Sequence, residues 1–574
     1  MCPTVGQRCP TRSLRLRALR PHLVPLVLLV GLAALVVGPA LTQLGAAVPG
    51  HPQGDVFEHV HGYWWVSEAL AAGRLPWEAG SFAVPDGGVL WFPDTLGALL
   101  AFPITRFAGA PAAFALGQWA QVAAALVAAY ALGLRFGTSR AAGMLAATLF
   151  GASPLVLGLL HSGVSEYLHL AAFPLLWLAS ERALRDGGRA LVPASLAWAW
   201  LGWANVYYAL FGVFVPLVAW WVADPRPPAM VAVRRYCAVA VGAAVGVAPV
   251  VWAIAASLNA DDAMLRNESA PGWGWVYLPA NDLAGLLLPG DAVYPDLAAR
   301  GNDGIRHVYY LGWVALGLGV AAGRRWWPAL ALVGTLALGP TLHWRGRPVQ
   351  VAGQVVPLPA ALLYVPGSPF RVVHHPYRVV VLANLVLAGA AAAALRRRPR
   401  WAGVAAGAVL VETAGAAPGP WPVEVASFGE VPPLPEPGGV WELPPDFRAL
   451  NRKWLGRQVL HARAVPYTIN VFLPPSWRSN AAYQAVMGCL EHAERRTIAR
   501  DAHPPLRAWL VQDSPQTVPE GIAELRAWGL RYVLVGPELD ADEAQCVVSR
   551  FGPAATELVV PGDRRVLDLG PTVR

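Results

Sequence analysis

Residues 12–44 read RSLRLRALRPHLVPLVLLVGLAALVVGPALTQL, a basic flank followed by an apolar stretch of about twenty residues. A helix of that length spans the hydrocarbon core of a bilayer, and the stretch is too long for the apolar region of a cleaved signal peptide. We therefore predict a retained first transmembrane helix, preceded by a basic cytoplasmic arm over residues 1–21.

The composition of the whole chain agrees with the prediction of a transmembrane helix. Of 574 residues, 55% are hydrophobic and only 14% are charged, and the mean hydropathy is +0.42. Such values predict a polytopic membrane protein and exclude fibrous and disordered classes. The formal net charge is +8, but the arginines form short clusters between apolar runs, as is typical of cytoplasmic loops. We expect no nucleic-acid partner.

Eleven apolar runs predict transmembrane spans. They lie near residues 22–44, 112–134, 141–160, 168–183, 190–205, 208–223, 236–257, 307–323, 327–342, 377–395 and 401–417. A further segment, residues 93–109, is short and carries Pro103 and Arg106, so it is either a twelfth span or a helix in the interface. Counting it as a span would put Arg135 and Arg140 outside and invert every later loop, against the positive-inside rule. We therefore predict eleven spans with the N-terminus inside.

The predicted fold is an all-α polytopic membrane domain over residues 22–417, followed by a small α/β domain outside the membrane. The predicted outer loops are residues 45–111, 161–169, 258–306 and 343–376. Residues 418–445 are rich in proline and glycine, which is typical of a linker. In residues 446–574 helical and strand patterns alternate, and the parity of the spans puts this domain outside.

The outer domain contains only two cysteines, Cys489 and Cys546. In an oxidising compartment they would form a disulfide if their Cα atoms lie within about 7 Å. Two cysteines in an α/β domain also occur as ordinary buried side chains. The distance between them therefore decides whether they pair.

The first polar cluster, GDVFEHVHGYWW at residues 54–65, lies just outside the first span. A helix would place Asp55, Glu58 and His59 at i, i+3 and i+4 on one face, where they can converge on a ligand or a metal. The alternative is an ordinary polar loop near the lipid headgroups, with the Tyr-Trp-Trp run as an aromatic belt.

A second cluster, HSGVSEYLHL at residues 161–170, contains His161, Glu166 and His169 in one short turn on the same predicted side. Ionisable groups this close together are costly unless they line a cavity or meet a partner. The alternative is a water-exposed cap for two helix ends. Carboxylates with imidazole suit magnesium or manganese, so the candidate metal ligands are Asp55, Glu58, His161 and Glu166.

The third cluster, FRVVHHPYR at residues 370–378, precedes the tenth predicted span. Guanidinium groups suit phosphate because they form bidentate, charge-assisted hydrogen bonds. The alternative is that these arginines extend to lipid headgroups at a helix end. The candidate substrate-binding residues here are Arg371, His374, His375 and Arg378.

The order of these pieces resembles the bacterial integral-membrane glycosyltransferases of the GT-C superfamily. The resemblance covers most of the chain and rests on short motifs: the GD at residues 54–55 with the following Trp64 and Trp65, the VPDGG loop, the turn GLLHSGVSEYLHLAAFPLLWL, then GTLALGPTLHW, LPAALLYVPGSPFRVVHHPYR, and GLRYVLVG in the tail. The chain departs from the family's commonest pattern because Asp55 and Glu58 are not an adjacent acidic pair. This departure leaves metal dependence and catalysis itself open.

The resemblance implies a bacterial inner-membrane enzyme that takes a sugar from a polyprenyl-phosphate donor and passes it to a glycan, lipid or protein acceptor on the outer face. It implies catalytic roles for Asp55, Glu58 and Glu166, and substrate binding by His59, His161 and the third cluster. Asp55 would accept the proton of the acceptor, and Arg371 or Arg378 would bind the lipid phosphate. Two other classes remain open at this point: a flippase for lipid-linked saccharide, and a non-catalytic protein that assists assembly of the cell envelope.

Overall fold

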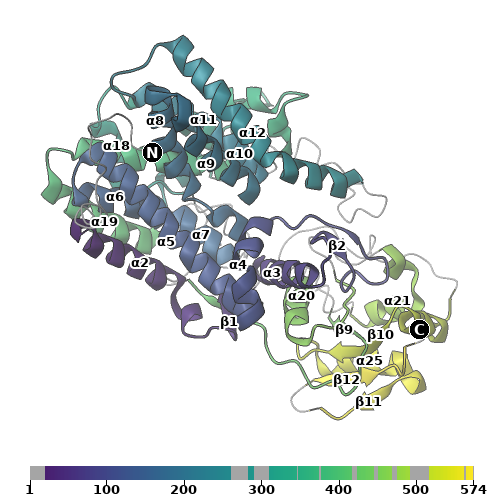
Figure 1. Cartoon of the computed structure of the whole chain (residues 1–574). Helices are drawn as coiled ribbons and strands as arrows, with labels where there is room; N and C mark the ends of the chain where they lie inside the picture. Colours follow the sequence, from purple (N-terminus) through teal and green to yellow (C-terminus); the bar gives the residue numbers. More distant parts are fainter. Residues whose placement is uncertain are drawn as a thin grey trace.

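The computed structural model describes most of the chain. The described residues are 20–52, 54–259, 282–289, 309–345, 347–373, 376–416, 423–444, 450–467, 475–490, 516–560 and 564–572. Figure 1 shows a helical part, built from the purple to green segments, and a smaller part that contains the yellow C-terminal sheet.

The helical part is formed by helices packed around one large apolar core. Its helices are α2 (Leu23–Val37), α4 (Thr95–Ala108), α5 (Ala110–Gly137), α6 (Arg140–Gly151), α7 (Pro154–Ser162), α8 (Ala172–Asp186), α9 (Leu191–Ala204), α10 (Val206–Gly212), α11 (Phe214–Val222), α12 (Ala229–Asn259), α14 (Leu283–Leu287), α16 (Trp313–Ala321), α17 (Trp327–Leu338), α18 (Val380–Ala394) and α19 (Pro399–Ala416). Short 3₁₀ turns join several of them, including η3 (Ser165–Leu168), η7 (Pro369–Val372) and η8 (Pro376–Val379). The pairs β4 (His343–Trp344) with β5 (Arg347–Pro348), and β6 (Gln350–Val351) with β7 (Gln354–Val355), lie between α17 and α18.

A described helix lies at each predicted span, but the number of crossings is not confirmed. Three described helical segments are long and apolar enough to cross a membrane: Arg20–Leu41, Ala110–Gly137 and Ala229–Asn259. The bent pair Arg140–Gly151 and Pro154–Ser162 is a fourth candidate. Several other helices are short or broken; α16, for example, has 9 residues and α17 has 12. The count of eleven therefore stays a prediction.

The ambiguous segment at residues 93–109 forms its own helix, α4, which ends at Gly109 before α5 begins at Ala110. Asp94 caps the start of α4, where its carboxylate accepts a hydrogen bond from the Gly97 amide at 3.0 Å. Phe107 is 91% exposed at the end of the helix. These features are those of a helix that packs on the bundle along part of its surface and presents apolar side chains on the other part.

The C-terminal part is built on a four-stranded sheet with the order β11-β12-β10-β9. Its strands are β9 (Gly439–Leu443), β10 (Leu530–Val535), β11 (Thr556–Leu558) and β12 (Arg565–Asp568). β9 runs parallel to β10, and β12 pairs antiparallel with both β10 and β11. The helices are α20 (Leu450–His461), α21 (Ala481–Cys489), α24 (Val518–Ala527) and α25 (Ala541–Phe551).

The sheet begins earlier than the sequence suggested. β9 lies inside residues 418–445, which we expected to be a linker, because the apolar run GVWEL has strand character within the Pro/Gly-rich composition. All five residues of β9 are buried. The boundary expected at residue 446 is therefore too late, and the segment before it is part of the folded domain.

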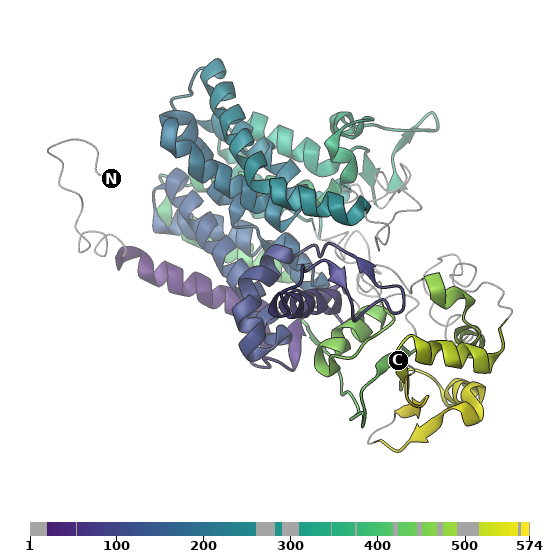
Figure 2. The same ribbon diagram turned by 45° about the vertical axis from the view of Figure 1, so that its right-hand side comes forward.

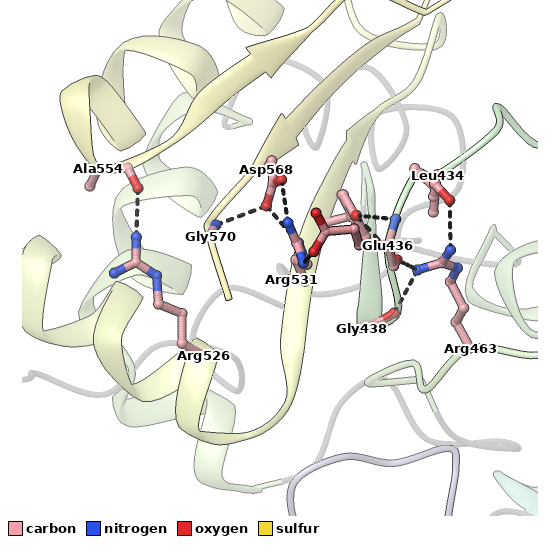
Figure 3. Close-up of polar contacts among 10 residues, drawn as sticks. Leu434, Glu436, Gly438, Arg463, Arg526, Arg531, Ala554, Asp568 and Gly570 are labelled. Carbon is pink, nitrogen blue, oxygen red and sulfur yellow. Dashed lines mark hydrogen bonds and ion pairs between the residues drawn. The ribbon is translucent and has the colours of Figure 1, made fainter. Parts of the chain in front are cut away.

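Two arginines fix the proline-rich approach to β9 (Figure 3). Arg463 donates to the carbonyl groups of Leu434, Glu436 and Gly438. Arg531 bonds both the Glu436 carboxylate and the Asp568 carboxylate, which links the approach to strand β12. These contacts satisfy carbonyls that have no strand partner, so this segment does not behave as a free tether.

The C-terminal part packs against the segment that follows α2. β1 (Ala47–Pro49) pairs antiparallel with β8 (Val425–Ser427), and α20 lies beside α3 (Val56–Ala71), as Figures 1 and 2 show. The small pair β2 (Glu78–Ala79) and β3 (Gly88–Val89) follows α3. One apolar core joins both parts, with Phe57, Trp454 and Trp441 among its fully buried side chains.

A buried polar contact fixes the register of α20 on α3. His61 is fully buried, and one ring nitrogen lies 2.8 Å from Oε1 of Gln458. Burial lowers the pKa of His61 to about 4, and the Gln458 hydrogen bond opposes that shift only in part. His61 is therefore a neutral structural side chain on the face of α3 that meets the C-terminal domain.

The distance criterion for the disulfide is met. Cys489 and Cys546 are bonded, and their Cα atoms lie 5.7 Å apart. The bond joins the end of α21 to α25 across a sequence separation of 57 residues. The predicted disulfide is therefore confirmed.

The close packing of α20 on α3 predicts a specific sensitivity at Gly456. A Cβ atom there would lie 2.8 Å from Cβ of Phe57, so Gly456→Ala should push the helices apart and lower stability by about 1–3 kcal/mol. Thermal unfolding followed by tryptophan fluorescence measures the effect. Gly488→Ala, in α21 with open space around the added atom, is the matched control and should be neutral or slightly stabilising. Equal unfolding temperatures for the two variants would contradict the packing described here.

Candidate functional site

The site depends on a close backbone contact between two loops. The Asp55 amide donates to the Ser162 carbonyl at 2.8 Å, and a Cβ atom on Gly54 would lie 2.7 Å from that same oxygen. Gly163 has φ +73°, and a Cβ there would lie 2.4 Å from Cβ of Val56. Glycine is needed at both positions because only it allows this approach. The GD and HSG motifs thus bring the start of α3 against the end of α7.

This contact opens onto a cavity of about 430 Å³. Its walls come from the start of α3, the chain before α4, η3, the α9–α10 junction, the end of α12 and η8. The lining residues are Asp55, Glu58, His59, Val89, Leu90, Trp91, Pro93, Val164, Glu166, Tyr167, Gly202, Trp203, Ala204, Asn205, Val206, Tyr207, Val250, Ile254, Ser257, Leu258 and Arg378.

The three residues of the first cluster lie together at the start of α3, as their spacing predicted. Asp55 precedes α3 without capping it through its side chain, and Asp55, Glu58 and His59 all line the cavity. Glu166, from the second cluster, lines the same cavity, and its Oε2 lies 3.4 Å from Nε2 of His59. Acids from two distant segments therefore share one wall.

Arg378 supplies positive charge to the same space. It is buried in η8, and its guanidinium carbon lies 3.6 Å from the centre of the Tyr167 ring. A cation over an aromatic face is held in place by the quadrupole of the ring. Arg378 is thus a fixed cation beside Glu166, and its charge acts on that carboxylate.

The other predicted binding residues lie elsewhere. The His161 ring lies 5.0 Å from the ring of His51, and His51 lies 3.8 Å from Glu424, so His161 faces the β1–β8 side and does not line the cavity. Arg371 is exposed on η7 and is not a lining residue. His374 and His375 lie outside the described residues.

The sequence did not single out Asp94, which has the densest polar surroundings near the site. Asp94 is completely buried and accepts hydrogen bonds from Tyr63, Ser165, His169 and the Gly97 amide. Ser165 also lies 3.1 Å from Nδ1 of His59, which joins this network to the cavity wall. The available signal was local: the PDT sequence at residues 93–95 is typical of a helix start, but it does not show which side chains meet the acid.

Of the four candidate metal ligands, Asp55, Glu58 and Glu166 line the cavity, whereas His161 does not. Within the described residues, no group of three His, Cys, Asp or Glu side chains is placed to hold a metal ion. Metal binding stays a prediction. We therefore derive no chemical step through a metal.

Comparison with solved structures identifies the architecture. The structure matches the cryo-electron microscopy structure of arabinofuranosyltransferase AftD from Mycobacteria with a TM-score of 0.55 and 15% sequence identity. The match covers 95% of this chain and 41% of AftD. The chain shares the fold of AftD, a GT-C glycosyltransferase.

A second GT-C structure also matches over most of the chain. ArnT from Cupriavidus metallidurans, solved with undecaprenyl phosphate bound, aligns with a TM-score of 0.39 and 13% identity, covering 95% of this chain and 98% of ArnT. No family model and no curated protein matches the sequence. The likeness to this GT-C fold is therefore structural, and the functional argument must come from the site itself.

The loop contact predicts that Gly163 is required for the site. Gly163→Ala should place a methyl group against Val56 and move Glu166 away from Asp55, with a loss of stability about 1–3 kcal/mol larger than in the control. Gly73→Ala is that control, because Gly73 has a similar φ of +67° but open space around it. Thermal unfolding of the two variants side by side measures the difference. If Gly73→Ala is equally harmful, the left-handed backbone alone explains the effect, and the close contact does not.

Proposed function

We propose that this chain is a membrane glycosyltransferase that moves a sugar from a polyprenyl-phosphate donor to an acceptor at the outer face of a bacterial inner membrane. The observation that carries the proposal is the mixed lining of the cavity. Asp55, Glu58, Glu166 and Arg378 form its charged part, and α12 contributes apolar side chains to the same lining. A phosphate on a long hydrocarbon chain has this same division of charge and apolar surface.

The lining residues support separate roles for an acid and a cation in the reaction. Asp55 is half-buried at the cavity and is the proposed base that accepts the proton of the acceptor hydroxyl. Arg378 is the proposed partner of the donor phosphate, whose charge grows as the bond to the sugar breaks. The fixed position of Arg378 over Tyr167 supports this role, because a cation held in place needs no reorganisation during the reaction.

The apolar part of the cavity lining supports entry of the donor from the lipid bilayer. Val250, Ile254 and Leu258 line the cavity from the last turns of α12, and Leu258 is 48% exposed on the surface of the protein. α12 is one of the described helices long enough to cross a membrane. A prenyl chain lying beside α12 would therefore place its phosphate at the charged part of the cavity lining.

Packing between distant segments supports the proposed sidedness. Because β1 pairs with β8, the chain must cross the membrane an even number of times between Pro49 and Val425. Eleven spans satisfy this condition, whereas adding α4 as a twelfth does not. The disulfide in the C-terminal domain also supports a location outside the cytoplasm, where such bonds persist.

The GT-C fold supports sugar transfer, since AftD is named as an arabinofuranosyltransferase, but this chain spans only 41% of AftD. The acceptor class therefore remains glycan, lipid or protein. Substitution of the proposed base separates transfer from the two other classes considered, a flippase and a non-catalytic assembly protein.

Substitution of the base is the direct test of the proposed function. Asp55→Asn keeps the shape of the side chain and removes the proton acceptor, so turnover with a polyprenyl-phosphate sugar should fall roughly 10²–10⁴-fold. Binding of polyprenyl phosphate should change little. Loss of donor with purified protein in lipid nanodiscs measures the turnover, and titration of the same protein with polyprenyl phosphate measures the binding. Full activity of Asp55→Asn would eliminate its role as the base, and a wild-type protein that moves lipid-linked sugar across vesicles without cleaving it would favour the flippase.

The two arginines of the third cluster should behave differently. Arg378→Gln deletes the buried cation at the cavity and should weaken binding of polyprenyl phosphate by about tenfold or more, because a charge-assisted contact is lost. Arg371→Gln is the matched control from the same motif, exposed and outside the lining, and should bind like wild type. Titration of nanodisc-embedded protein with polyprenyl phosphate measures the affinities. Equal losses in the two variants would argue against a specific phosphate position beside Arg378.

A further inference from the structure

Asp94 is a fully occupied acceptor behind the cavity wall. One carboxylate oxygen accepts from the Tyr63 hydroxyl at 2.9 Å and from Ser165, and the other accepts from His169 at 3.1 Å and from the Gly97 amide at 3.0 Å. A carboxylate offers about four acceptor positions, so these donors occupy them all. Asp94 has no exposed surface and does not line the cavity. It orients its neighbours and does not touch a substrate.

Trp200 fixes the tautomer of His169. An indole N–H can only donate, and Nε1 of Trp200 lies 3.3 Å from Nδ1 of His169. Nδ1 therefore accepts, and the ring proton of neutral His169 is on Nε2. That nitrogen lies 3.1 Å from Asp94 and donates to it. Nε2 also lies 3.2 Å from the side-chain amide of Gln121, whose oxygen can accept from the same N–H when the amide is flipped.

Ser165 determines which ring nitrogen of His59 carries the proton. A serine hydroxyl has one proton, which Ser165 gives to Asp94. The Ser165 oxygen also lies 3.1 Å from Nδ1 of His59, so Nδ1 must be the donor in that contact. Neutral His59 then carries its proton on Nδ1, and its Nε2 is a proton acceptor. Nε2 lies 3.4 Å from Oε2 of Glu166.

His59 and Glu166 therefore meet as an acceptor and an acid at the surface of the cavity. Burial raises the pKa of Glu166 to about 8, against the opposing charge of Arg378 and with the help of the negative charges of Asp94 and Asp55. At neutral pH the carboxyl keeps a proton that it can offer to His59 Nε2. Both residues line the cavity, so this proton lies where a bound substrate can reach it.

We propose that Asp94 and Ser165 are positioning residues that hold His59 in the Nδ1-protonated tautomer, so that His59 Nε2 and Glu166 share one proton at the cavity wall. Its catalytic use rests on the proposed function. As the bond between the sugar and the phosphate oxygen breaks, the shared proton passes to the departing polyprenyl phosphate. The acceptor oxygen bonds the sugar and its proton passes to Asp55, after which both sites exchange protons with water.

Nitrogen NMR of the full chain in nanodiscs tests the tautomer without any activity. With ¹⁵N-labelled histidine, the His59 signal is identified by its loss in His59→Gln, and it should show the Nδ1-protonated form in wild type. In Ser165→Ala the preference should weaken, because Nδ1 loses its acceptor. A wild-type signal from the Nε2-protonated form would overturn the proposal, whatever the kinetics show.

Kinetics test the use of the shared proton. Ser165→Ala should lower kcat roughly 10-fold to 100-fold, the range known for groups that orient metal-bound histidines, with the donor KM nearly unchanged. A merely structural role would change the donor KM together with kcat.

A buried serine on the same helix as His59 provides the control. Ser67 is 1% exposed, and within the described residues its hydroxyl makes no hydrogen bond, so Ser67→Ala should leave kcat and KM unchanged. A kcat of Ser165→Ala equal to that of Ser67→Ala would overturn the catalytic part of the proposal. If wild type transfers no sugar, the proposed function fails instead, and the NMR result still decides the tautomer.

Discussion

The contact of the Asp55 amide with the Ser162 carbonyl is the constraint on which the site depends. It joins two segments more than one hundred positions apart, and it forms only because Gly54 and Gly163 allow the backbones to approach. Without it the acids at the start of α3 would have no fixed position relative to the turn after α7. With it, the start of α3 and the turn after α7 form one wall with Arg378 beside it, and a cavity of defined chemistry results.

The C-terminal domain stabilises the position of α3, which forms part of this wall. α20 lies against α3, and Phe57, Trp441 and Trp454 fill the shared core. Aromatic side chains of this kind bury roughly 150–250 Å² each, so they contribute strongly to the association. The neutral His61 and Gln458 give the interface a fixed register. The domain thus fixes the position of α3 at the site.

The sequence predicted features that depend on local pattern. The helical periodicity of Asp55, Glu58 and His59 was sufficient to place them on one face, and cysteine chemistry was sufficient to suggest the Cys489–Cys546 pair. Features that depend on distant partners were missed. The role of Asp94 follows mainly from donors on α3 and at η3, which are distant in sequence, and the orientation of His161 depends on β1 and β8. Strand β9 was also missed, because its short apolar run lies between prolines and glycines.

A structure of the chain with a polyprenyl phosphate bound in a nanodisc tests the central claim most directly. The account predicts phosphate density beside Arg378, within reach of the Asp55 and Glu166 wall, and a prenyl chain that follows Val250, Ile254 and Leu258 along α12. Phosphate bound at another face of the protein, with this cavity left to solvent, would contradict the account.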